Sequence, residues 1–169
     1  MANQMLENET LFDGYDSADK NPPLGGYAAL AATFAGATLG FSAWVKQSGR
    51  DLPERVAPGD LALVTVATHK AARLLAKDRV TSAARAPFTH YQDEGIPGEV
   101  KEQPRGEGLR RAIGELLICP YCLSVWIATA FAAGLVAAPR PTRWAASILT
   151  AVFGSDVLQA VYLKLEEST

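Results

Sequence analysis

The chain has 169 residues, of which 49% are hydrophobic, and its formal net charge at neutral pH is −2. This length suits one domain or one compact membrane bundle. Lys and Arg do not outnumber Asp and Glu, so the chain lacks the cationic excess that binds a phosphate backbone, and nucleic acid is excluded as a partner. A single close pair of cysteines is not the disulfide framework of a small secreted domain.

The first predicted membrane helix follows an acidic, polar tail. The tail, residues 1–23, has none of the features of a signal or transit peptide. Residues 24–45 carry no charge, and as a helix they would measure about 33 Å, enough for a hydrocarbon core of roughly 30 Å. Gly36 and Gly40 lie four positions apart and predict a smooth face for helix packing.

The next segment, residues 60–77, begins apolar and becomes charged after Thr68. It could lie along the membrane surface as an amphipathic helix, or it could span if Arg73 faces protein. We favour the spanning helix. Residues 86–109 are rich in Gly, Pro and charges of both signs, which is typical of a polar loop.

Two further apolar blocks complete the predicted bundle. Residues 112–138 contain one charge, Glu115, and residues 143–164 contain Asp156. A short C-terminal tail, residues 164–169, follows. The sequence therefore predicts an all-α integral membrane bundle of three to four transmembrane helices with a polar cytoplasmic loop. Lys and Arg are densest between residues 77 and 111, so this side is expected to be cytoplasmic and the C-terminus with it.

Charged residues within the spans should face protein, because an isolated charge in lipid is costly. We expect Arg73 to pair with Glu115 or Asp156 as a buried ion pair that fixes helix register, in preference to a proton path. Where the second segment leaves the membrane, we expect an organising group in which Asp78 lies near Arg79 or Arg85 and Thr81 caps a new turn. The predicted polar network is Arg73, Asp78, Thr81, Arg85, Glu115 and Asp156.

The tetrad Cys-Pro-Tyr-Cys, residues 119–122, is the most distinctive motif. A continuous helix starting near Arg111 and kinked at Pro120 would place Glu115, Cys119, Cys122 and Trp126 on one face, in the inner half of the bilayer. Both thiols are then expected to be buried and reduced. Three interpretations compete: a dithiol redox centre, a zinc or iron site, or two small residues that pack a kinked helix. We favour the last.

The metal interpretation needs further ligands. Cys119 and Cys122 would supply half of a zinc site, and His69, His90 or a second copy of the chain would have to complete it. The two histidines lack ligand-like spacing. No cofactor is predicted, and zinc or iron remains the alternative at the cysteine pair.

Nine residues together are similar to the pattern of an uncharacterised bacterial family of small membrane proteins, a domain of unknown function that includes a Bacillus sporulation-associated protein. They are Arg73, Asp78, Thr81, Arg85, Pro87, Phe88, Cys119, Cys122 and Trp126. The resemblance covers residues 60–163, which leaves residues 24–45 as an added span. It implies a multi-pass protein of the bacterial cytoplasmic membrane, and it implies no known reaction.

The leading functional hypothesis is a non-enzymatic structural or assembly subunit of a membrane complex. Its partners would be the lipid bilayer and other membrane subunits or a second copy of the chain. The alternative is a metal- or thiol-dependent membrane protein that uses the Cys-Pro-Tyr-Cys motif.

Overall fold

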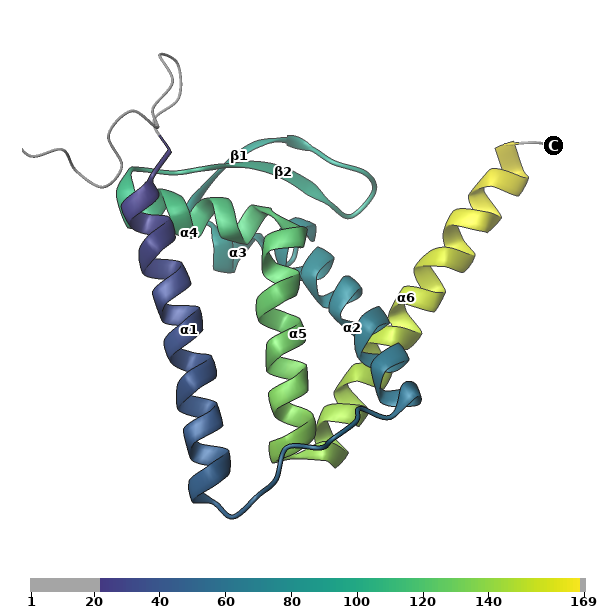
Figure 1. The fold of residues 1–169 in the computed structure, drawn as a ribbon. Helices are drawn as coiled ribbons and strands as arrows, with labels where there is room; N and C mark the ends of the chain where they lie inside the picture. The colour runs from purple at the N-terminus through teal and green to yellow at the C-terminus, as the bar shows by residue number, and fades with distance from the viewer. Residues whose placement is uncertain (1–21, 168–169) are drawn as a thin grey trace, which may run out of the picture.

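The computed structural model describes residues 22–167, which are mainly helical (Figure 1). The elements in chain order are α1 Leu24–Gln47, α2 Pro58–Lys77, α3 Ser82–Arg85, β1 Thr89–Glu94, β2 Val100–Pro104, α4 Gly108–Ile118, α5 Pro120–Ala137 and α6 Pro139–Glu167. The predicted acidic tail falls outside the described residues except for its last two positions. The predicted C-terminal tail begins within α6, which continues to Glu167.

Three helices, α1, α5 and α6, are long and apolar enough to cross a membrane. They correspond to the three apolar blocks of the sequence. In each, only 6% of the most apolar window is buried inside the chain, so these helices bury few of their side chains against one another. The second predicted segment, α2, is also a helix of 20 residues, but it does not belong to this set, and Lys70, Arg73 and Lys77 occupy its second half.

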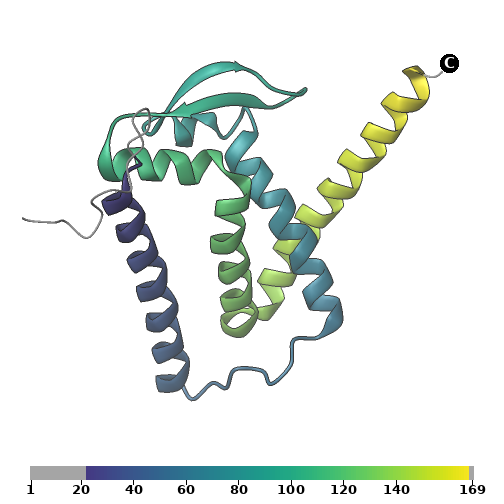
Figure 2. The same cartoon turned by 45° about the horizontal axis from the view of Figure 1, so that its top comes forward.

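The long helices alternate in direction (Figure 1). α1 runs away from the end of the molecule that carries the strands, α2 returns to it, α5 runs away again and α6 returns. The views in Figures 1 and 2 both place α3, α4 and the two strands together at this one end, which we call the polar cap (residues 78–118). α2 packs against both α5 and α6, whereas α1 contacts the rest of the chain mainly through α4.

The prediction of an all-α fold is confirmed only in part: the described chain is mainly helical, but the polar cap contains a two-stranded β-hairpin where a loop over residues 86–109 was expected. β1 and β2 pair antiparallel from Thr89 opposite Pro104 to Glu94 opposite Val100, with a bulge between Tyr91 and Asp93. Most positions of β1 are exposed. The strands consequently lack the alternation of apolar and polar residues by which a half-buried strand is usually predicted.

The helix predicted over residues 112–138 is two helices. α4 ends at Ile118, and Cys119 has extended backbone angles (φ −105°, ψ 100°) before α5 begins at Pro120. Figure 1 shows α4 lying across the end of the bundle while α5 runs along it. Proline suits the first position of a helix, where its missing N–H has no partner to lose. Pro120 therefore starts a helix instead of kinking one, and Glu115 does not share a face with Trp126.

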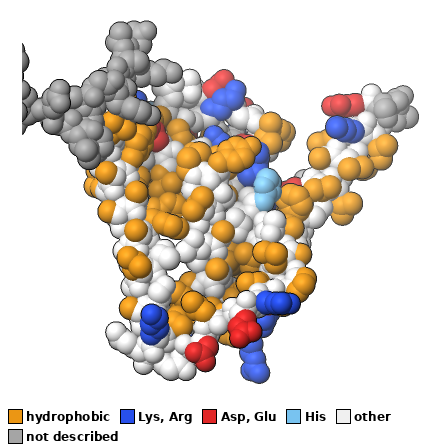
Figure 3. Space-filling model, in the orientation of Figure 1, with side chains coloured by type: hydrophobic (Ala, Val, Ile, Leu, Met, Phe, Trp, Pro, Cys, Tyr) orange, Lys and Arg blue, Asp and Glu red, His pale blue; other side chains and the backbone are white. Residues whose placement is uncertain are grey.

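The fully buried core is small. Ala72, Ala76 and Leu123 form its centre, and Leu116, Leu117 and Ile127 pack around them. Hydrophobic side chains instead cover the surface between the two ends of the long helices, while charged side chains gather towards those ends (Figure 3). This distribution is compatible with association with a membrane.

Candidate functional site

The centre of the polar cap is the side chain of Arg85, which is the largest fully buried side chain in the described residues. Its Nε donates to Glu102 Oε2 at 2.5 Å, and the two side chains are only 2% and 5% exposed. Its Nη1 donates to the carbonyl of Leu75 at 2.8 Å and to Thr81 Oγ1 at 2.6 Å, and its Nη2 donates to the carbonyl of Asp78 at 3.1 Å. All three nitrogens of the guanidinium thus donate to polar partners.

These bonds tie α2 to the hairpin. The last carbonyls of a helix have no partners within it, and they carry partial negative charge. Arg85 supplies both donors and a positive charge at this terminus, and Thr81 Oγ1 adds a bond to the carbonyl of Leu74 at 2.6 Å. Because Glu102 lies on β2, a single arginine joins the C-terminus of α2, the short helix α3 and the hairpin.

Asp78, Thr81 and Arg85 meet at the exit of α2, but their contacts differ from the expected ones. Thr81 stands at the N-cap position of α3 without a side-chain capping bond, and its hydroxyl bonds back to α2 instead. Asp78 reaches Arg85 through its carbonyl, while its carboxylate accepts the N–H of Val80 at 2.9 Å. Arg79 pairs with Glu94 at 3.1 Å, not with Asp78.

The predicted pairing of Arg73 with Glu115 or Asp156 was wrong. Arg73 pairs with Glu99 of the hairpin turn, and Asp156 pairs with Lys70 at 2.5 Å. Glu115 pairs with Arg111 at 2.9 Å on its own helix. Of the six predicted polar residues, Asp78, Thr81 and Arg85 are therefore linked to one another, whereas Arg73, Glu115 and Asp156 belong to three separate ion pairs. Sequence reasoning missed Glu99 and Glu102, the partners of Arg73 and Arg85, because both lie in a segment that was expected to be a polar loop.

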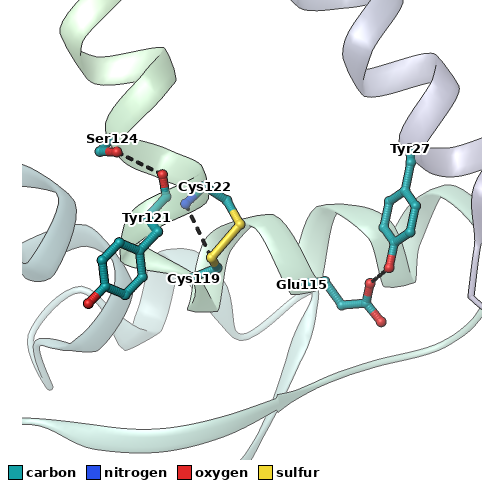
Figure 4. The surroundings of a disulfide bond; sticks show 6 residues. All are labelled: Tyr27, Glu115, Cys119, Tyr121, Cys122 and Ser124. Carbon is teal, nitrogen blue, oxygen red and sulfur yellow. Dashed lines mark hydrogen bonds between the residues drawn. A yellow bond between two sulfur atoms is a disulfide. The ribbon is translucent and has the colours of Figure 1, made fainter.

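Helix α4 connects the cap to α1 through close contacts. The hydroxyl of Tyr27 on α1 donates to the carboxylate of Glu115 (Figure 4). A Cβ added to Gly26 would lie 2.7 Å from Ala112 Cβ, and one added to Gly114 would lie 2.4 Å from the carbonyl oxygen of Phe88. Both glycines thus permit a close approach that any side chain would prevent.

Cys119 and Cys122 are joined by a disulfide at the junction of α4 and α5 (Figure 4). Cys119 is the N-cap of α5, and its Sγ accepts the N–H of Cys122 at 3.2 Å. Cys119 is half-buried, whereas Cys122 is exposed and Tyr121 beside it is 88% exposed. The thiols were expected to be reduced and buried within the span. The structure instead places a bonded pair at the very start of the helix, because the chain breaks at Cys119.

The histidines considered as metal ligands lie on different elements from the cysteines. His69 on α2 packs edge-on against Phe153 of α6, with 5.3 Å between ring centroids, and His90 lies on β1. Over residues 22–167, no three His, Cys, Asp or Glu side chains are grouped closely enough to hold a metal ion.

The predicted packing face of α1 has no partner within residues 22–167. A Cβ added to Gly36 or Gly40 would meet no atom within 4 Å. The opposite face of α1, with Phe34 and Phe41, lines a mostly apolar groove of about 1380 Å³ against α2 and α5. In a bilayer this groove would be filled by hydrocarbon, while the glycine face would be turned to the surroundings.

Three apolar helices joined to a charged, hairpin-bearing cap define a small helical protein, and these helices are compatible with membrane association. The chain belongs to the DUF1360 family, described as proteins of unknown function, whose family model matches residues 63–162. Among curated proteins it is similar to "Sporulation protein YjcA" of Bacillus subtilis (strain 168), with 26% identity over 107 residues, which are 62% of this chain and 91% of that protein. No solved structure matches the chain.

The family match confirms the resemblance drawn from the sequence. It begins within α2 and ends near the end of α6, so it contains the whole polar cap and the cysteine pair. Helix α1 lies outside the matched residues.

Proposed function

We propose that this protein is a multi-pass membrane protein with a structural role, acting as a subunit or assembly element of a larger membrane complex. The observation that supports this role is the uncovered surface of its apolar helices, each of which buries only 6% of its most apolar window inside the chain. Helices associate in lipid through close packing of their surfaces. A chain that uses little of its helix surface for its own fold leaves most of it for lipid and for partners.

The alternation of α1, α2, α5 and α6 supports four crossings, with both described ends on the side of the polar cap. In this topology the charged half of α2 lies near the cap, where Lys70 pairs with Asp156 and Arg73 with Glu99. The cap contains the densest run of Lys and Arg in the chain. By the positive-inside rule, the cap and the C-terminus face the cytoplasm of a bacterial cell.

The outer face of α1 is the surface that we assign to a partner helix. Phe34 and Phe41 face the rest of the chain. At about 100° per residue, Gly36 lies roughly 140–160° and Gly40 roughly 100–120° around the helix from them. Small residues spaced by four let two helix backbones approach closely. The partner is therefore a transmembrane helix, either of another protein or of a second copy of this chain.

The test is the state of the protein when it is extracted from membranes. Crosslinking in native membranes, followed by purification in mild detergent, should yield a discrete complex. The double variant Gly36→Leu with Gly40→Leu should prevent this complex from forming. These changes leave the monomer intact, because no atom lies near either glycine. Ala35→Leu places a leucine at another exposed position of α1 and serves as the control. A lone monomer in every detergent, with no crosslinked partner, would overturn the proposal.

A further inference from the structure

We infer that Cys119 and Cys122 form a thiol–disulfide exchange site that takes a protein dithiol as its redox partner. This inference is independent of the subunit role proposed above and takes from that proposal only the cytoplasmic side of the cap. It rests on three observations at the start of α5: the bond between the two sulfurs, the exposure of one of them and the hydrogen bond to the other.

The position of the disulfide does not fit a structural staple. The bond joins the N-cap of α5 to the first turn of the same helix, so it links no elements that are distant in the chain. A disulfide stabilises a fold mainly by constraining the unfolded chain, and the effect is smallest for the shortest loop. The contacts that hold the cap to the bundle are the Arg85 hydrogen bonds and the packing of α4, and neither includes a cysteine.

The two sulfurs differ in a way that sets the direction of attack. Cys122 is exposed and Cys119 is half-buried, so an incoming thiolate reaches Cys122. The sulfur that is then expelled, Cys119 Sγ, already accepts the N–H of Cys122 and lies at the N-terminus of an 18-residue helix. Backbone N–H groups and the positive end of the helix dipole stabilise a thiolate at this place. Cys119 is therefore the leaving group when the partner attacks Cys122. In the reverse direction, the Cys119 thiolate attacks Cys122 Sγ in the mixed disulfide and expels the partner.

The exchange proceeds in two displacements. A thiolate of the partner attacks Cys122 Sγ, the bond between the two cysteines breaks, and its electron pair stays on Cys119 as a thiolate. The second thiolate of the partner attacks its own sulfur in the mixed disulfide and releases Cys122 as a thiolate. The two protons lost by the partner end on Cys119 and Cys122. The chain gains two electrons and the partner dithiol becomes a disulfide.

The surroundings of the pair suit access by a protein partner. Tyr121, which lies between the two cysteines in the sequence, is 88% exposed. Its ring points away from the disulfide (Figure 4). The pair lies where α4 meets α5, at the N-cap and in the first turn of an apolar helix. On the cytoplasmic side proposed above, disulfides that persist are usually catalytic or redox-sensing.

The test equilibrates the full chain in detergent micelles with mixtures of reduced and oxidised glutathione, and then blocks free thiols with a maleimide that adds mass. The chain has two cysteines, so each band is assigned without ambiguity. We expect both thiols to appear together and both forms to be populated across these mixtures. A pair that stays bonded at every ratio, or one that never forms the bond, would overturn the inference. Metal analysis showing zinc or iron bound by the reduced pair and lost in Cys119→Ser would overturn it as well.

Single variants test the roles of the two sulfurs. With oxidised glutathione, Cys119→Ser exposes a Cys122 thiol without its partner and should trap a mixed disulfide. Cys122→Ser leaves the half-buried Cys119 thiol, and this thiol should form the mixed disulfide at least tenfold more slowly than Cys122 does in Cys119→Ser. Equal rates would refute the assignment of Cys122 as the sulfur that the partner reaches. Ser124 lies two residues after Cys122, and its hydroxyl donates to the carbonyl of Tyr121. The control variant Ser124→Ala should exchange like the parent chain.

Discussion

Replacing Arg85 by methionine tests whether the polar cap is held by one buried arginine. The change removes the partner of Glu102 and leaves a carboxylate that is 5% exposed without its cation. It also removes the donors to the carbonyls of Leu75 and Asp78. Breaking a buried ion pair from one side costs about 3–5 kcal/mol. We therefore expect Arg85→Met to lower the free energy of unfolding by about that amount, with early exposure of the hairpin.

The measurement is unfolding of the purified chain in mixed micelles, followed by circular dichroism, together with proteolysis of the hairpin. Arg79→Met is the matched control, because Arg79 and Glu94 are 58% and 71% exposed and such surface pairs contribute less than about 1 kcal/mol. Adding Glu102→Leu to Arg85→Met should restore part of the loss, because it removes the unpaired buried charge. A loss below about 1 kcal/mol for Arg85→Met, or purely additive effects in the double variant, would refute this account of the cap.

Three further changes test the packing of α4 and the disulfide. Gly114→Ala should destabilise the fold by about 1–3 kcal/mol, because its Cβ would overlap the carbonyl of Phe88; Gly154→Ala, which meets open space, should be neutral or stabilising in the same unfolding assay. Gly26→Ala should separate α1 from α4, measured as loss of a crosslink between cysteines engineered into these helices, and an unchanged yield would contradict the contact. Reduction of the Cys119–Cys122 disulfide should lower the free energy of unfolding by at most about 2 kcal/mol, since it opens a loop of four residues. Global unfolding on reduction would instead show that the bond is structural.

The sequence predicted the long helices well because a membrane-length apolar block is a strong local signal. The blocks at residues 24–45 and 143–164 each correspond to one helix of the structure. The break between α4 and α5 was harder to predict. Proline stops an incoming helix and starts an outgoing one with the same residue, and nothing local to residues 112–120 distinguishes a kink from a change of direction. The contact of Gly114 with the hairpin, which holds α4 across the bundle, connects residues that are distant in the sequence.

The hairpin could not be predicted because its strands carry few apolar residues and their ion-pair partners lie on distant helices. Its residues are mostly polar on both sides. The pairs that fix it, Arg73 with Glu99 and Arg85 with Glu102, join α2 and α3 to β2 and to the turn before it. The sequence placed Arg85 in the group expected at the exit of the second segment, and the family resemblance supported it. The residue that it binds, Glu102, was absent from the resemblance and from the predicted site.

The same arrangement explains why the family match and helix α1 are separable. Residues 63–162 contain the cap, its ion pairs and the packing of α2 against α5 and α6, so the contacts of Arg73 and Arg85 that join α2 to the hairpin lie within the matched region. Helix α1 joins this unit chiefly through Gly26 and Tyr27 against α4, and further along through Phe34 against Trp126. Because these contacts use only the inner face of α1, its glycine face adds a surface that the matched region does not supply. The added helix therefore extends what the protein can contact without altering how the cap is built.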